Sequence, residues 1–140
     1  MEVCVMNRTD AIRYSYRPHE EQSVVISIST PFDRHGEKIY PSLYNKIVAV
    51  LPLLFDDVDG GKDCMTAEDA QKIATFVKRH EGKKIIVHCD AGVSRSAGIA
   101  AAILKHYTGD DRKIFDSPRY CPNMLCYRLT LTALIAEHTK

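Results

Sequence analysis

The chain has 140 residues, a length that fits one domain over residues 1–140 and a core that buries about two-thirds of the surface of the unfolded chain. Its formal net charge of +1 at pH 7 argues against a long basic groove for nucleic acid. The five cysteines are irregularly spaced and suggest neither a disulfide framework nor a C-x-x-C metal site, so we expect a reducing, cytoplasmic compartment.

The first ten residues, MEVCVMNRTD, have no sustained apolar core after a basic start and do not resemble a secretory signal. No apolar run approaches the roughly 18 residues that cross a membrane. We therefore expect a monomer without a membrane partner. No helix or strand is predicted before residue 23.

Two segments rich in β-branched and other apolar residues predict strands. Ser23–Thr30 (SVVISIST) is followed by a proline and is typical of a buried strand. Lys46–Phe55 (KIVAVLPLLF) is the second, and Pro52 indicates an edge position or a strand end. Between them, Phe32–Tyr44 mixes charged residues with glycine, proline and tyrosine and is predicted to be a loop.

An acidic turn, Asp56–Asp63, precedes a helix that is predicted to begin at Thr66. The sequence Thr-Ala-Glu-Asp places a carboxylate three residues after a capping hydroxyl, and Gly82 is suited to end the helix. Apolar residues at helical spacing give this helix one apolar face: Ala70, Ile73, Ala74 and Val77.

The second half of the chain predicts one more strand, at Lys84–Val87, and three helices. The first helix follows a tight loop and ends near Gly109, and the second is short, within Asp110–Phe115. The last runs from Asn123 to about His138. Its predicted apolar stripe is Leu125, Leu129, Ala133 and Ala136.

Strands that alternate with helices predict an α/β fold, with a central, mostly parallel sheet flanked by helices. In such sheets ligands bind beyond the carboxyl ends of the strands. Three loops are expected to meet there, at residues 31–44, 56–63 and 88–98. The acidic turn is therefore expected to face Cys89.

The most informative stretch is His88–Gly98, which reads HCDAGVSRSAG between an apolar strand and a helix of small residues. A tight loop of this kind points its backbone N–H groups inward, where they converge on phosphate oxygens. The positive end of the following helix adds to the same field. We expect the loop to bind a phosphate group through Asp90, Ala91, Gly92, Val93, Ser94 and Arg95.

The side chains of this loop suit phosphoryl transfer. The local field favours a thiolate at Cys89, which would then be a nucleophile. Arg95 can fork two N–H groups onto two phosphate oxygens. The Ser96 hydroxyl can bond the sulfur and help it leave, although Ser94 could do this instead or cap the helix. We expect His88 to hold the loop in shape.

His-Cys-Asp-Ala-Gly-Val-Ser-Arg-Ser resembles the H-C-x5-R-S signature of cysteine-dependent protein tyrosine phosphatases, most of all the compact dual-specificity type and its bacterial and phage relatives. The resemblance extends to the strand that leads into the acidic turn and to Tyr120-Cys121-Pro122-Asn123, which resembles the Pro-Asn element before the family's last helix. It implies the phosphatase α/β sandwich and hydrolysis through a phosphocysteine intermediate, with no cofactor and no metal.

The resemblance also implies a general acid about thirty residues before the cysteine. Asp57 lies 32 residues before Cys89 and matches best, while Asp56 is the alternative and Asp59 a weaker one. Asn123 is expected to cap the last helix, and a second role in orienting the acidic turn or the phosphate loop stays open.

The implied substrate is a phosphorylated protein or peptide carrying phosphotyrosine, with phosphoserine and phosphothreonine left open. The loop has no lysine, which weighs against inositides. An RNA 5′-triphosphatase and a phospho-binding module without catalysis stay as alternatives. Phe32, Arg34, His35, Tyr40 and Tyr44 could line the entrance, or could belong to a solvated loop.

Overall fold

The computed structural model describes residues 1–32 and 38–140. Its sheet has four strands in the order β1-β4-β2-β3, and all neighbouring strands are parallel. The predicted α/β class with a central parallel sheet is therefore confirmed. The strands are β1 (Val3–Met6), β2 (Ser23–Ser29), β3 (Ile47–Leu54) and β4 (Lys84–His88).

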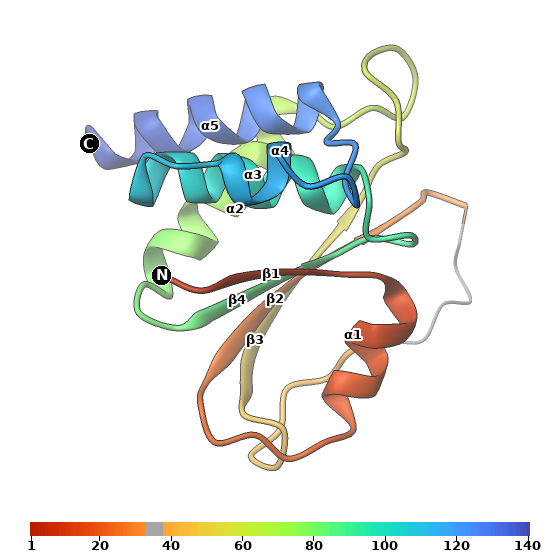
Figure 1. Ribbon diagram of the computed structural model, residues 1–140, viewed down its shortest axis with the longest axis vertical. Helices are drawn as coiled ribbons and strands as arrows, with labels where there is room; N and C mark the ends of the chain where they lie inside the picture. Colours follow the sequence, from red (N-terminus) through yellow and green to blue (C-terminus); the bar gives the residue numbers. More distant parts are fainter. Residues whose placement is uncertain (33–37) are drawn as a thin grey trace.

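Helices cover both faces of this sheet. Figure 1 shows α2, α3 and α5 together on one face and α1 on the other. The side chains of β2 alternate accordingly: Val24 and Ile26 belong to the large core under the three helices, and Val25 belongs to a smaller core beside α1. The helices are α1 (Arg8–Ser15), α2 (Ala67–Arg79), α3 (Arg95–Thr108), α4 (Arg112–Phe115) and α5 (Met124–His138).

Two elements that the sequence did not reveal, β1 and α1, lie before residue 23. Strand β1 is only four residues long and forms by pairing with β4, with Val3 opposite Ile85. Helix α1 is largely polar and buries only Ala11, although Asn7 caps its first turn. Short strands and polar helices give weak periodic patterns, so tertiary contacts determine these two elements.

Several local predictions are confirmed. Strand β3 lies at the edge of the sheet, where Pro52 is tolerated. Thr66 and Asp69 form a capping box at the start of α2, and the four predicted apolar residues of that helix are buried. Helix α3 ends at Gly109, which takes the left-handed conformation at φ 76°.

The predicted stripe of α5 is only partly right. Leu125, Leu129 and Ala133 are half-buried and Ala136 is exposed. The fully buried residues of this helix lie one position further along the chain: Cys126, Thr130 and Leu134. These residues are four apart and lie on one face of α5, which packs against both α2 and α3. This face includes a cysteine and a threonine, so the pattern of apolar residues does not mark it.

The direction of the strands fixes where a site can form. The last residues of β1, β2, β3 and β4 all lie at one edge of the sheet, because the strands are parallel. The start of α1, the acidic turn after β3 and the loop between β4 and α3 therefore meet there. In the part of the chain that the structure describes, no helix is both long and apolar enough to cross a membrane.

Gly98 of α3 lies in close contact with the start of α5. A Cβ atom at this position would overlap the carbonyl oxygen of Asn123 and lie 3.1 Å from Cβ of Cys126. The lack of a side chain at residue 98 thus sets the position of Asn123, the residue that caps α5.

We expect Gly98→Ala to lower the free energy of unfolding by about 1–3 kcal/mol, the usual cost of overpacking, although alanine has the higher helix propensity. Gly60→Ala is the matched control, because no atom lies within 4 Å of its added Cβ. Urea denaturation of both variants measures the difference. Equal stabilities would contradict the proposed close contact.

Candidate active site

The loop between β4 and α3 is held against the start of the chain. Gly92 has φ 68°, and a Cβ atom there would lie 2.6 Å from the backbone nitrogen of Asn7 and 2.7 Å from the carbonyl carbon of Met6. The backbone N–H of Arg8 donates to the carbonyl oxygen of Asp90 at 3.2 Å. Both the conformation and the close approach therefore require glycine at position 92.

The Cys89 thiol is buried at the foot of this loop, and its Sγ lies 3.1 Å from Oγ of Ser96. Burial by itself raises the pKa of Cys89. Hydrogen bonds from the side chain and backbone of Ser96 and from the backbone of Gly92, together with the charge of Arg95, outweigh burial and hold the pKa below its ordinary value. The loop thus stabilises a thiolate at the position predicted for the nucleophile.

Arg95 is 5% exposed, and two of its three nitrogens have partners. Its Nη1 donates to the carbonyl oxygen of Phe55 at 2.9 Å, and its Nη2 donates to Oδ2 of Asp90 at 3.2 Å. The buried Nε has no hydrogen-bond partner among the described residues. A buried N–H without a partner is costly, and an oxyanion bound in the loop would satisfy it.

His88 faces away from the loop, into the sheet. Its Nε2 lies 2.7 Å from Oγ of Ser27 on β2. Burial lowers the pKa of His88 to about 4, so the ring is neutral at physiological pH. This position fits a residue that supports the loop, as the sequence indicates, and not one that exchanges a proton with a substrate.

The acidic turn brings Asp57, and not Asp56, to the loop. Oδ1 of Asp57 accepts a hydrogen bond from Oγ of Ser94 at 2.8 Å and one from Nδ2 of Asn123 at 2.9 Å. Oδ1 of Asp56 instead accepts from the backbone N–H of Asp57 at 2.8 Å, so its carboxylate caps its own turn.

Asn123 ties the last helix to both loops. Its Oδ1 accepts from the backbone N–H of Cys126 and caps α5, while its Nδ2 donates to Asp57 and to the carbonyl oxygen of Val58. Its backbone N–H donates to the carbonyl oxygen of Ser94 at 3.0 Å. One side chain thus makes both the cap that the sequence predicts and two hydrogen bonds to the acidic turn.

Other predicted residues have different places. The Ser94 side chain makes no capping bond to α3, because it donates to Asp57. Ala91 is exposed and Val93 half-buried, so both would serve a ligand through the backbone. The carbonyl oxygen of Tyr40 is bonded by Asn45, which also bonds the carbonyl oxygen of Ser15 at the end of α1.

Tyr40 and Tyr44 therefore lie at the amino-terminal edge of the sheet, where both are exposed. Of the two alternatives that the sequence left open for them, the solvated loop fits and the entrance does not. Phe32 is exposed just beyond the end of β2. Arg34 and His35 lie outside the described residues. The structure adds Arg8, which no local pattern singles out: it bonds Asp90, 82 residues away in the sequence.

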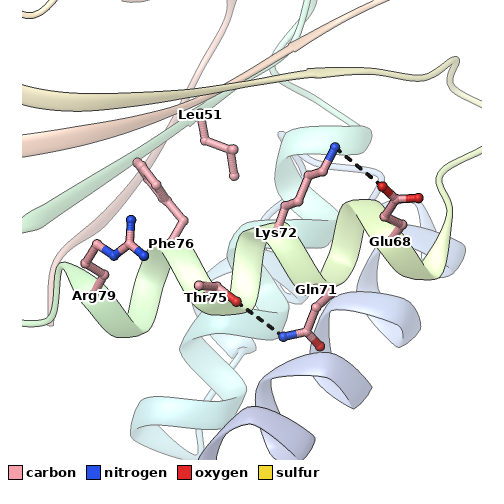
Figure 2. Close-up of a pocket in the computed structure, with 7 residues that line it drawn as sticks. All are labelled: Leu51, Glu68, Gln71, Lys72, Thr75, Phe76 and Arg79. Carbon is pink, nitrogen blue, oxygen red and sulfur yellow. Dashed lines mark hydrogen bonds and ion pairs between the residues drawn. The ribbon is translucent and has the colours of Figure 1, made fainter.

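A separate pocket of about 310 Å³ lies between β3 and α2 (Figure 2). Leu51 and Phe76 form its apolar part, and Lys72 and Glu68 at its rim pair with each other at 3.8 Å. None of the predicted site residues lines it, so it does not belong to the candidate active site.

We expect Ser96→Ala to slow alkylation of Cys89 about tenfold at a fixed pH below the thiol's midpoint, because a hydrogen bond to a charged group contributes about 1.5 kcal/mol. Loss of this bond raises the pKa of Cys89, so the pH profile of iodoacetamide labelling moves to higher pH. Mass spectrometry of the Cys89 peptide gives the rate, and Ser117→Ala is the control. An unchanged profile would show that Ser96 does not stabilise the thiolate.

Searches of protein-family models and of curated proteins with this sequence find no match. Solved structures do match. Human DUSP28 has 15% identity and a TM-score of 0.60, with 98% of this chain and 94% of that chain covered. PTPMT1 in complex with PI(5)P has 18% identity and a TM-score of 0.59, with 99% and 93% covered.

A third match is the human tyrosine phosphatase-like serine/threonine/tyrosine-interacting protein, with 20% identity, a TM-score of 0.59, and 86% of this chain and 80% of that chain covered. At such identities the likeness concerns the fold. The parallel sheet, the helices on both its faces and the position of the loop after β4 agree with the resemblance that the sequence shows. The chain has the fold of the compact dual-specificity type of the cysteine-dependent protein tyrosine phosphatases.

Proposed function

We propose that the chain is a cysteine-dependent phosphatase that hydrolyses phosphate monoesters through a phosphocysteine intermediate. The observation that carries this proposal is the meeting of three groups at one loop. They are the Cys89 thiol with its lowered pKa, the buried Arg95 whose Nε–H has no partner among the described residues, and the Asp57 carboxylate bonded to Ser94. Nucleophile, phosphate ligand and general acid are the parts that the reaction needs.

In the first step the Cys89 thiolate attacks phosphorus, and the bond between phosphorus and the ester oxygen breaks. Arg95 and the backbone N–H groups of the loop hold the phosphoryl oxygens in line and stabilise their charge in the transition state. Asp57, in its protonated form, gives its proton to the leaving oxygen. The products of this step are the free alcohol or phenol and phosphocysteine.

In the second step Asp57, now a carboxylate, takes a proton from a water molecule that attacks phosphorus. The phosphorus–sulfur bond breaks, and inorganic phosphate forms. Because Oγ of Ser96 lies 3.1 Å from Sγ of Cys89, its hydroxyl can donate to the departing thiolate. The enzyme returns to its starting state without a cofactor.

For the substrate we propose phosphotyrosine in proteins or peptides, extended to phosphoserine and phosphothreonine. The loop has an aspartate at position 90 and no lysine, which weighs against inositides. PTPMT1 was solved with PI(5)P, so the fold admits an inositide in that protein. A turnover panel should therefore contain phosphopeptides, an inositide and triphosphorylated RNA.

Cys89→Ser is expected to lower hydrolysis of a phosphotyrosine peptide by about 10³-fold or more, because serine is a far weaker nucleophile in this setting. Tungstate binding should survive, since Arg95 and the loop backbone remain. Released phosphate measures turnover, and calorimetry measures binding. Retained turnover would contradict the phosphocysteine mechanism, and a wild-type protein that binds tungstate but hydrolyses no member of the panel would indicate a binding module.

Asp57→Asn should slow hydrolysis of phenyl phosphate by about 10²-fold or more, because its leaving group needs a proton. Hydrolysis of p-nitrophenyl phosphate should fall much less, since nitrophenolate leaves without one. Asp56→Asn is the matched control, and steady-state rates on both esters give the comparison. If Asp56→Asn shows the selective loss instead, the general acid is Asp56.

A further inference from the structure

We propose that Arg8 is a positioning residue of this site: it neutralises Asp90 and thereby leaves Arg95 available to hold the phosphate group. The inference rests on the proposed function, since it concerns the same phosphate loop. It assigns a role to a residue at the start of α1, an element far from the signature loop in the sequence.

The carboxylate of Asp90 lies between two guanidinium groups. Its Oδ1 accepts from Nε of Arg8 at 3.0 Å and from Nη2 of Arg8 at 2.8 Å. Its Oδ2 accepts from Nη2 of Arg95 at 3.2 Å. The two bonds from Arg8 are shorter than the one from Arg95, so Arg8 is the main partner of the Asp90 carboxylate.

Arg8 is itself well anchored. Its Nη2 also donates to Oγ of Ser29 at the end of β2, at 3.0 Å, and its backbone N–H donates to the carbonyl oxygen of Asp90. The Arg8 side chain is 18% exposed and that of Asp90 is 42% exposed. The guanidinium is therefore fixed in place before any ligand arrives, which limits the entropic cost of its bond to Asp90.

The charges show why this matters. Burial raises the pKa of Asp90, but the hydrogen bonds and charges of Arg8 and Arg95 outweigh burial and keep the pKa low, so this residue is ionised. The Cys89 thiolate and Asp90 together balance Arg8 and Arg95. Without Arg8 the loop would carry one net negative charge, which would repel a phosphate dianion and disfavour the thiolate.

The geometry adds a second effect. A carboxylate and an arginine readily form a bidentate ion pair, and this pair uses the same arginine N–H groups that would bind phosphate. Because Arg8 occupies Oδ1 of Asp90 with two N–H groups, Arg95 shares only one nitrogen with Oδ2. Its Nε is left without a partner among the described side chains and backbone.

A double-mutant cycle tests this role. We expect Arg8→Met to weaken tungstate binding about tenfold in the wild-type background, because Asp90 would then compete with the anion for the N–H groups of Arg95. In the Asp90→Asn background, where no carboxylate competes for Arg95, the same change should cost less than about threefold. Arg13→Met, on the same helix, is the matched control, and thermal unfolding checks that each variant is folded.

Labelling of Cys89 by iodoacetamide gives a second reading. Arg8→Met should move its pH profile to higher pH, and adding Asp90→Asn should move it back. A residue that only braces the fold would not produce this reversal. Arg8→Lys keeps the charge and, where Arg8→Met does not fold, should bind tungstate within about threefold of the wild type.

The outcomes separate the two proposals. An equal cost of Arg8→Met in both backgrounds, no cost in either, or a tenfold loss in Arg8→Lys would overturn the role of Arg8. Calorimetry measures tungstate binding directly, so these results do not depend on catalytic turnover. If the variants show the expected coupling but the wild-type protein hydrolyses no phosphate ester, the phosphatase activity is contradicted and the role of Arg8 is not.

Discussion

The buried guanidinium of Arg95 is the group on which the arrangement of the site depends. A buried charge needs partners, and the fold supplies them from two directions. Asp90 comes from the same loop, and the carbonyl oxygen of Phe55 comes from the residue that follows β3. Phe55 is fixed in turn, because its N–H donates to the carbonyl oxygen of Ser29 at 3.1 Å. The acidic turn therefore begins at the residue that satisfies Arg95.

This arrangement explains how the proposed general acid is held against the phosphate loop. Asp57 comes two residues after Phe55, and its carboxylate is held by Ser94, the residue before Arg95, and by Asn123. Asn123 can stand there because Gly98 lets α5 approach α3. The position of Asp57 thus depends on Gly98, a residue of α3 that touches no catalytic group but lets Asn123 come close.

The sequence predicts the parts of this site that local chemistry determines. The offsets of Cys89, Arg95 and Ser96 in one loop, the capping box of α2 and the glycine that ends α3 are all signals within a few residues. The choice between Asp57 and Asp56 is different, because it depends on which carboxylate the turn directs toward Ser94 and Asn123. That direction follows from the path of the backbone, and neighbouring residues do not encode it.

Arg8, like β1 and α1, could not be predicted for a related reason. It contacts Asp90 only because β1 pairs with β4 and because Gly92 lets the loop touch the backbone of Asn7. Tyr40 and Tyr44 show the same limit: they are near the acidic turn in the sequence, but the intervening strand β3 carries them to the other edge of the sheet, so the sequence could not choose between an entrance and a solvated loop. Sequence distance therefore misleads wherever a strand separates two residues.

His88, which supports the phosphate loop from beneath, makes the stability of the fold depend on pH. His88 has an ordinary pKa of 6.5, which burial lowers to about 4 in the fold. Between these values the unfolded chain binds a proton that the folded chain does not, so His88 makes the fold lose stability as the pH falls from about 6.5 to about 4. Above that range the ring is neutral, and its bond to Ser27 does not titrate. At neutral pH the residue that supports the loop beneath Cys89 therefore stays in one protonation state.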